Sequence, residues 1–147
     1  MGLKSWKKLK HNGKTMEQIL KAHELFWASK EGGARLPGAD LSCANLRKAD
    51  LRNTDLTEAA LTGANLMEAQ ASGVEFFRCD LTKANFQRAL LRNANFRDAH
   101  LDGATFAGAD MGITILRETD LRNVDLSGVD LSTTLLPPGW GAKKQGA

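Results

Sequence analysis

Residues 39–51 read ADLSCANLRKADL, and the five-residue spacing of their leucines decides the fold of the chain. The same spacing continues in one frame from Leu36 to Leu136, where all 21 positions are apolar. Two residues before each of them stands a small side chain, most often Ala. The residue between the small and the large position is usually Asp or Asn. A repeat of five residues therefore organises about two thirds of the 147 residues.

The odd repeat length excludes a continuous strand. Alternate side chains of a strand point to opposite faces, so an uninterrupted strand would turn every second repeat outward. The chain must bend at the two remaining residues of each repeat to bring the next Ala-x-Leu unit inward. Short strands joined by corners wind into a coil, and neighbouring coils must bury its faces. The second bend position often holds residues that tolerate tight turns: Gly38, Gly63, Gly73, Gly103, Gly108, Gly128, Asn53, Asn93 and Asn123.

The units Ala39-Asp40-Leu41, Ala44-Asn45-Leu46 and Ala84-Asn85-Phe86 resemble the A-[DN]-L-x-x register of the pentapeptide-repeat family. The resemblance covers about 100 of the 147 residues. It implies an all-β solenoid, a right-handed quadrilateral parallel β-helix of about five coils with an N-terminal α-helical cap. Each coil would hold four repeats, or twenty residues. That spacing also aligns similar side chains in columns, namely Thr54 with Val74, Thr114 with Thr134, Phe76 with Phe96, and Phe86 with Phe106.

We expect the inward apolar positions to form a ladder of Leu and Phe lined by Ala. Burial of each large side chain contributes about 1.5–3 kcal/mol. The lining residues are small because larger ones would overpack a narrow interior. The residues assigned to this core ladder are Leu41, Leu61, Phe76, Leu81, Phe86, Phe96, Leu101, Phe106 and Leu121.

The sequence divides into four segments. Residues 1–14 form a basic arm that we expect to be flexible, 15–33 a capping helix, 34–136 the β-helix, and 137–147 a C-terminal tail. The stretch Thr15-Met16-Glu17-Gln18 has the pattern of a capping box, and Gly32-Gly33 ends the helix. A single His on an apolar face is more often a core residue than a ligand. The apolar face of this helix is assigned to Ile19, Leu20, His23, Phe26 and Trp27.

Charge is distributed unevenly along the chain, whose net charge is +3. Residues 1–35 hold eight Lys or Arg and three Glu, whereas residues 36–136 hold ten Lys or Arg and fourteen Asp or Glu. Lysines beside Trp6 and Leu9 give the arm a composition seen in binders of nucleic acid and anionic membranes. Surface binding of nucleic acid or a membrane through this arm is therefore one alternative function. The arm is short and contains few apolar residues, which disfavours both partners.

Composition also bounds the location. No run of about 18 apolar residues is available for a transmembrane helix, and the first residues lack the apolar region of a secretory signal. Two cysteines, Cys43 and Cys79, do not make a disulfide framework. We expect a bacterial-type cytoplasmic protein with free thiols.

Outward positions stack in columns twenty residues apart, which brings polar side chains together by chance. One column places His100 between Asp80 and Asp120. It lacks a nucleophile, a third strong ligand and a pocket, so we interpret it as structural pairing. A second column predicts a hydrogen-bonding ladder between coils. We assign no catalytic residue, no metal ligand and no cofactor. The members of the second column are Asn45, Asn65, Asn85, Thr105 and Asp125.

Large apolar residues stand at several positions where the register favours polar ones. Leu90, Ile115 and Leu135 replace the usual Asp or Asn, and Ile113 occupies an outward turn position. Contiguous exposed apolar surface marks contacts. The C-terminal tail, a second copy of the chain and a separate partner are alternative occupants. Some family members dimerise through the C-terminal end of the rod, so the resemblance implies a homodimer as one alternative. The candidate interface is Ile113, Ile115, Leu135 and Trp140.

These features favour a non-enzymatic protein–protein interaction or scaffold module whose partner is unknown. No phosphate-binding loop, nucleophile–base pair or metal-ligand spacing indicates an enzyme. The resemblance to quinolone-resistance pentapeptide proteins implies one alternative, a DNA mimic that modulates a type II topoisomerase. That mechanism needs a strongly acidic surface. The basic net charge disfavours it, as does a belt of cations on the repeats: Arg78, Lys83, Arg88, Arg92 and Arg97.

The register predicts that substitutions at positions 84 and 82 differ in how much they destabilise the protein. Ala84→Leu should destabilise the protein by about 1–3 kcal/mol because it overpacks the interior. Thr82→Ala, at an outward bend position, should cost less. Thermal unfolding of both variants measures the difference, and equal melting temperatures would contradict the register.

Overall fold

The computed structural model describes residues 4–5, 10–11, 14–15 and 33–141 of the chain. The predicted capping helix and its apolar residues Ile19, Leu20, His23, Phe26 and Trp27 lie outside these ranges. Its first residue, Thr15, belongs to strand β3 (Lys14–Thr15).

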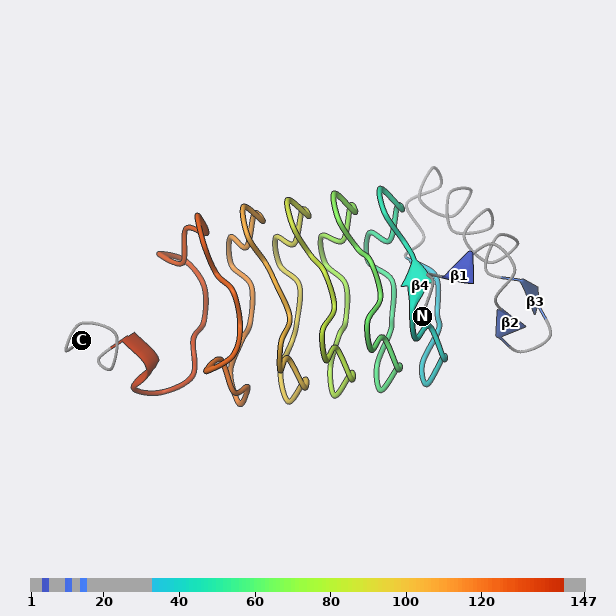
Figure 1. Cartoon of the computed structure of the whole chain (residues 1–147). Coiled ribbons are helices and arrows are strands. Elements are labelled where there is room, and N and C mark those ends of the chain that lie inside the picture. Colours follow the sequence, from blue (N-terminus) through green and yellow to red (C-terminus); the bar gives the residue numbers. More distant parts are fainter. Residues whose placement is uncertain (1–3, 6–9, 12–13, 16–32, 142–147) are drawn as a thin grey trace.

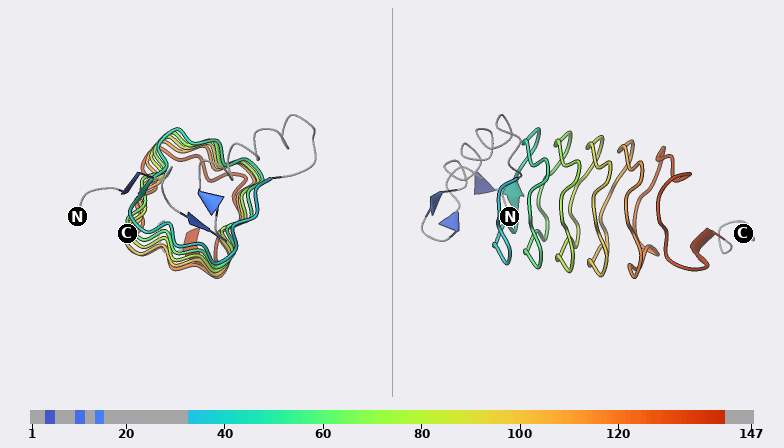
Figure 2. Two further views of the ribbon diagram at one scale, coloured as in Figure 1. Left: turned by 90° about the vertical axis from the view of Figure 1, so that its right-hand side faces the viewer. Right: turned by 180° about the vertical axis from the view of Figure 1, so that it is seen from behind.

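Residues 34–136 form a solenoid of stacked four-sided coils (Figures 1 and 2). Each side of a coil pairs in parallel with the residue twenty positions further on, from Arg35↔Asp55 at one end to Ile115↔Leu135 at the other. The expected spacing of four repeats per coil is therefore confirmed. We call the end near Arg35 the upper end and the end near Leu135 the lower end.

Each side of a coil pairs through very few residues, because a corner follows after every third residue. Most sides contain a single bridging residue, and only strand β4 (Ala44–Asn45) is two residues long within the coils. Strand β1 (Lys4–Ser5) pairs in parallel with β4 on the upper end. Strand β2 (Lys10–His11) pairs antiparallel with β3. The segment expected to be a flexible arm thus contributes β1 and β2.

Nearly every corner is a tight turn closed by a backbone hydrogen bond, such as that from the Ala44 N–H to the Leu41 carbonyl (3.0 Å). The third residue of the turn has a positive φ, which is the left-handed region that favours glycine. Six Gly of the repeats occupy this position, and twelve other residues do so as well, of which only Asn53 and Asn93 are asparagine. Neighbouring coils therefore hold most of these corners in a conformation that their side chains disfavour.

The outward Asp and Asn residues serve these turns. In Asn85, the side-chain Oδ1 accepts the N–H of Gln87, two residues on, at 2.9 Å. The same bond recurs at eleven other Asp or Asn positions and, through a hydroxyl, at Thr105. The predicted ladder along the Asn45 column is therefore wrong for its asparagines. Their oxygens cap their own turns, and only Thr105 donates to the next coil, to Asp125.

The interior is filled by the predicted ladder positions. The structure places all nine core-ladder residues at 5% exposure or less. Phe76 stacks on Phe96 with ring centroids 4.7 Å apart, and Phe86 stacks on Phe106 at 4.8 Å. The two stacks meet edge to face at 5.4–5.6 Å. Coil spacing and ring stacking coincide, so aromatic contacts run along the axis without a gap.

The turn-capping bond predicts a position-specific cost. Asn85→Leu should lower the free energy of unfolding by about 1 kcal/mol, because the Gln87 N–H loses its acceptor. Gln70→Leu is the matched control, since the Gln70 side chain caps no turn and the next coil carries Leu90 in the same column. Urea denaturation measures both, and an equal loss in the two variants would contradict the capping role.

Candidate functional site

Some outward residues cap no turn, so turn formation does not require their side chains. They comprise Arg35, Ala60, Gln70, Glu75, Leu90, His100, Ile115 and Leu135. The fold alone does not explain why these side chains stand there. Two groups among them carry recognisable surface chemistry: the apolar residues of the lower coils, and His100.

The apolar residues gather around one corner of the lower coils. Leu90, Ile113 and Leu135 are 47%, 52% and 42% exposed and are the large hydrophobic residues exposed in the described part of the chain. Ile115 is half-buried and pairs with Leu135 in the next coil. We call Leu90, Ile113, Ile115 and Leu135 the apolar corner. Its members belong to three successive coils and to the two sides that meet at the Ile113 turn.

Ile113 is strained as well as exposed. Its φ is +58°, and the equivalent turns of other coils carry Asn53, Gly73 and Asn93. A β-branched residue is poorly suited to this region, which costs roughly 1–2 kcal/mol. Its N–H is held by the Thr133 hydroxyl at 3.2 Å. The fold therefore bears a cost for an exposed isoleucine that the nearby asparagines avoid.

Trp140 is placed differently from the other candidate interface residues. It is half-buried, packs against the core at the lower end, and its N–H bonds to the Pro137 carbonyl at 3.2 Å. It lines a cavity of about 330 Å³ with residues 119–122 and 137–139. The side chain thus covers part of the core edge and does not extend the apolar corner.

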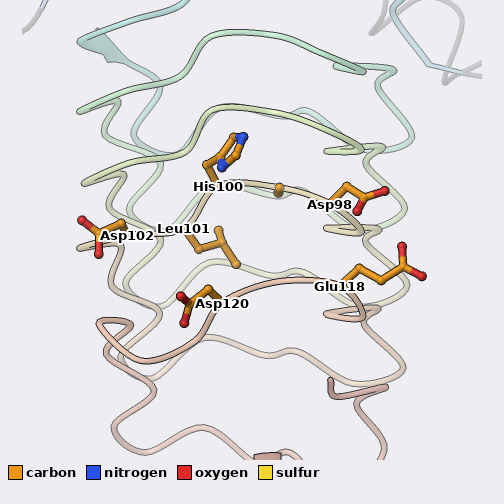
Figure 3. Close-up of a pocket in the computed structure, with 7 residues that line it drawn as sticks. Asp98, His100, Leu101, Asp102, Glu118 and Asp120 are labelled. Atoms are coloured by element: carbon orange, nitrogen blue, oxygen red, sulfur yellow. The ribbon is translucent and has the colours of Figure 1, made fainter. Parts of the chain in front are cut away.

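A second cavity, of about 460 Å³, adjoins His100. Asp98 and Glu118 lie to one side of His100, and Asp102 lies to the other (Figure 3). The coils separate here, because His100 pairs with Asp80 but forms no bridge with Asp120 in the described ranges. The Thr119 hydroxyl donates to the Leu116 carbonyl, which takes the place of the N–H bond that closes the equivalent turn at Ala99.

Three of the four carboxylates that line this cavity accept hydrogen bonds from residues other than His100. The Arg122 guanidinium lowers the pKa of Asp120 to about 2, so the expected pairing of Asp120 with His100 is wrong. Glu118 accepts two bonds from Arg97, at 2.7 and 2.9 Å, and Asp102 accepts one from Asn123. The hydrogen bond from the Thr82 side chain is the largest cause of the lowered pKa of Asp80. Within the described ranges, no three His, Cys, Asp or Glu residues are grouped to hold a metal ion.

The two cysteines are free thiols in different environments. Cys79 is fully buried, donates to the Leu56 carbonyl at 2.8 Å, and has a pKa raised to about 12 by its burial. Cys43 is half-buried at a corner. A thiol as buried as Cys79 remains protonated and unreactive at neutral pH.

Several cations of the rod surface lie beside carboxylates of neighbouring coils. Arg97 pairs with Glu118 (2.7 Å), Arg88 with Glu68 (3.2 Å), and Arg92 with Asp110 (3.4 Å). The surface is therefore a mosaic of both signs. Among the described residues, no helix has the length and hydrophobicity needed to cross a lipid bilayer.

Comparison with known proteins found a match over most of the chain. The family model described as Pentapeptide repeat region matches residues 33–106, and that described as Pentapeptide repeats (8 copies) matches residues 114–136. No curated protein sequence matches the chain.

Solved structures of pentapeptide repeat proteins resemble the solenoid. One from Nostoc Pcc 7120 is 28% identical, with a TM-score of 0.61 over 80% of this chain and 94% of that one. One from the Arabidopsis thaliana thylakoid lumen is 26% identical, with a TM-score of 0.45 over 78% and 83%. QnrB1, a plasmid-mediated fluoroquinolone resistance protein, is 16% identical, with a TM-score of 0.37 over 79% and 73%.

The strain at Ile113 predicts that its replacement stabilises the protein. Ile113→Asn should raise the free energy of unfolding by about 1 kcal/mol, because Asn tolerates the left-handed region and little packing is lost. Ile113→Val keeps the branched side chain and should match the parent. Urea denaturation distinguishes them, and a destabilised Ile113→Asn variant would contradict the strain.

Proposed function

Because the chain belongs to the pentapeptide-repeat family, we propose that it is a non-enzymatic module that binds another protein through its apolar corner. The observation that carries this proposal is Ile113, an exposed β-branched residue held at positive φ. Strain that the fold does not need is found where function requires it. A partner that buries Ile113 would offset that cost.

The rest of the corner supports the same surface. Leu90 and Leu135 are large, exposed and apolar, and Ile115 adds a half-buried side chain next to Leu135. Exposed apolar side chains that lie together indicate a protein contact. An Asp or Asn at position 90 or 115 could have capped its turn, so the apolar choice at these two positions gives up a local bond that most repeats keep. Position 135 could not hold such a cap, because Pro137 has no N–H to donate.

The alternative of DNA mimicry finds no support in the surface charges. A mimic needs a continuous acidic stripe, whereas Arg88, Arg92 and Arg97 pair with carboxylates along the rod. We therefore favour a partner recognised by apolar contact. We also propose that the protein works in the cytoplasm, where its free thiols would remain reduced.

Affinity capture from a native lysate tests the proposal, with full-length protein and two corner variants. Ile113→Asn and Leu135→Thr should lose a partner that the parent retains. The first of these is expected to be more stable than the parent, so loss of binding would not reflect unfolding. Met67→Thr, at a different corner, is the matched control and should retain the partner.

Two outcomes would contradict the proposal. Capture of the same proteins by all four forms would show that the apolar corner is not the contact. Recovery of untagged copies of the chain alone, lost in both corner variants, would make the corner a homodimer interface instead.

A further inference from the structure

The lower end presents a row of backbone N–H groups without acceptors. In most repeats, two N–H groups donate downward to carbonyls of the next coil, although those of Leu101 and Met111, in the coil directly above the last one, have no such acceptor within the described chain. Two coils above the lower end, the equivalent N–H groups of residues 81–93 all have acceptors. The Leu81 N–H donates to the His100 carbonyl (2.8 Å), for example, and the Asn93 N–H donates to the Gly112 carbonyl (3.1 Å). Within the described chain, the corresponding groups of the last coil have none: Leu121, Asn123, Leu126, Gly128, Leu131 and Thr133.

The same edge exposes part of the core. Val124, Leu126, Val129 and Leu131 are half-buried, whereas their equivalents two coils above, such as Phe86 and Leu91, are fully buried. Trp140 contacts the side formed by residues 119–122 and leaves residues 123–131 outside its cavity. An apolar surface and unpaired donors thus lie together along two sides of the coil.

The rim of this edge is acidic. Residues 117–136 contain Arg117 and Arg122 against Glu118, Asp120, Asp125 and Asp130, a net charge of −2. Asp125 and Asp130 accept hydrogen bonds from Ser127 and Ser132, which lower the pKa of both carboxyls. Both are therefore ionised at neutral pH. A rim of this sign attracts cations and repels nucleic acid and anionic lipid.

The direction of the backbone hydrogen bonds in a parallel coil determines which backbone groups can pair with this edge. Downward-facing groups are mainly N–H donors, so the lower end of a second copy would bring donors against donors. An extended segment of another chain supplies the carbonyls instead. Strand β1 shows this geometry on the upper end of the same protein, where the extended Lys4–Ser5 pairs in parallel with β4 (Figure 1).

We propose that the lower end binds an extended segment of a partner protein by parallel β-pairing along one side of the last coil, through the N–H groups of Leu126 and Gly128. The segment would carry Lys or Arg at positions facing the acidic rim and apolar side chains at alternate positions facing the open core. This surface is separate from the apolar corner, and the inference goes beyond the proposed function. It concerns backbone pairing rather than apolar side-chain contact.

A heptapeptide in which lysine alternates with valine is a suitable probe. Its affinity for the full-length protein is measured at low salt, and amide hydrogen exchange of the protein is followed residue by residue by NMR. We expect binding together with slower exchange, by about tenfold or more, at Leu126 and Gly128. A peptide with glutamate in place of lysine should not bind. A lysine peptide with one central proline keeps most of the charge but should not slow exchange.

Charge variants test the rim without disturbing its turns. Asp120→Asn, Asp125→Asn and Asp130→Asn together keep the capping oxygens, as Asn does elsewhere in the repeats, and should weaken the lysine peptide about tenfold. The matched control combines Asp40→Asn, Asp55→Asn and Asp80→Asn on other coils and should bind like the parent. Ile113→Asn should also bind like the parent, which separates this site from the apolar corner.

Three results would overturn the inference. Equal binding of the lysine and proline peptides, without slower exchange, would reduce the effect to charge attraction. Slow exchange of these amides in the free monomer would mean that the chain's own residues cover the edge. A dimer in sedimentation, with the amides protected only at high protein concentration, would assign the edge to a second copy.

Discussion

The hydrogen bonds at each corner are the interactions on which the structure depends. A repeat of five residues can keep its large apolar side chain inward only if the chain bends once per repeat. The bend is closed by a backbone bond across the turn and, in most repeats, by an Asp or Asn oxygen that holds the N–H two residues on. Because these bonds fix direction at every corner, coils stack in register and the interior closes around Leu and Phe.

This division of labour separates structural from functional positions on the surface. An outward Asp or Asn is explained by the turn that it caps, so a column of such carboxylates or amides is weak evidence of a functional site. An outward residue that cannot cap a turn has no such explanation. The apolar corner is made of residues of this kind together with Ile113, whose positive φ adds a second cost. Rigid coils can hold such a residue because the turns above it are held by their neighbours.

The two ends of the rod differ for a related reason. Most N–H groups that bond between coils point downward, so a coil depends on the carbonyls of the coil below it. On the upper end, β1 occupies part of the edge. On the lower end, Pro137 and Pro138 lack N–H groups and leave the register, and Trp140 packs under only one side. The donors of the last coil remain as a binding edge with an acidic rim.

The sequence by itself determined the period, the inward positions and the need for corners, because these follow from side-chain alternation and the five-residue spacing. It also located Leu90, Ile113, Ile115 and Leu135, since apolar residues stand out against a polar register. The tertiary structure alone decided three further points. Asn85 and its equivalents cap turns because their oxygens lie beside an N–H two residues away. The sequence does not show whether such a side chain bonds along its own turn or to the next coil. Asp120 turns to Arg122 rather than His100 because the Thr119 hydroxyl replaces a turn bond and the coils separate there. The strain of Ile113 depends on its backbone angle, and the unpaired donors within the described part of the last coil depend on which coil lies next. The sequence alone specifies neither.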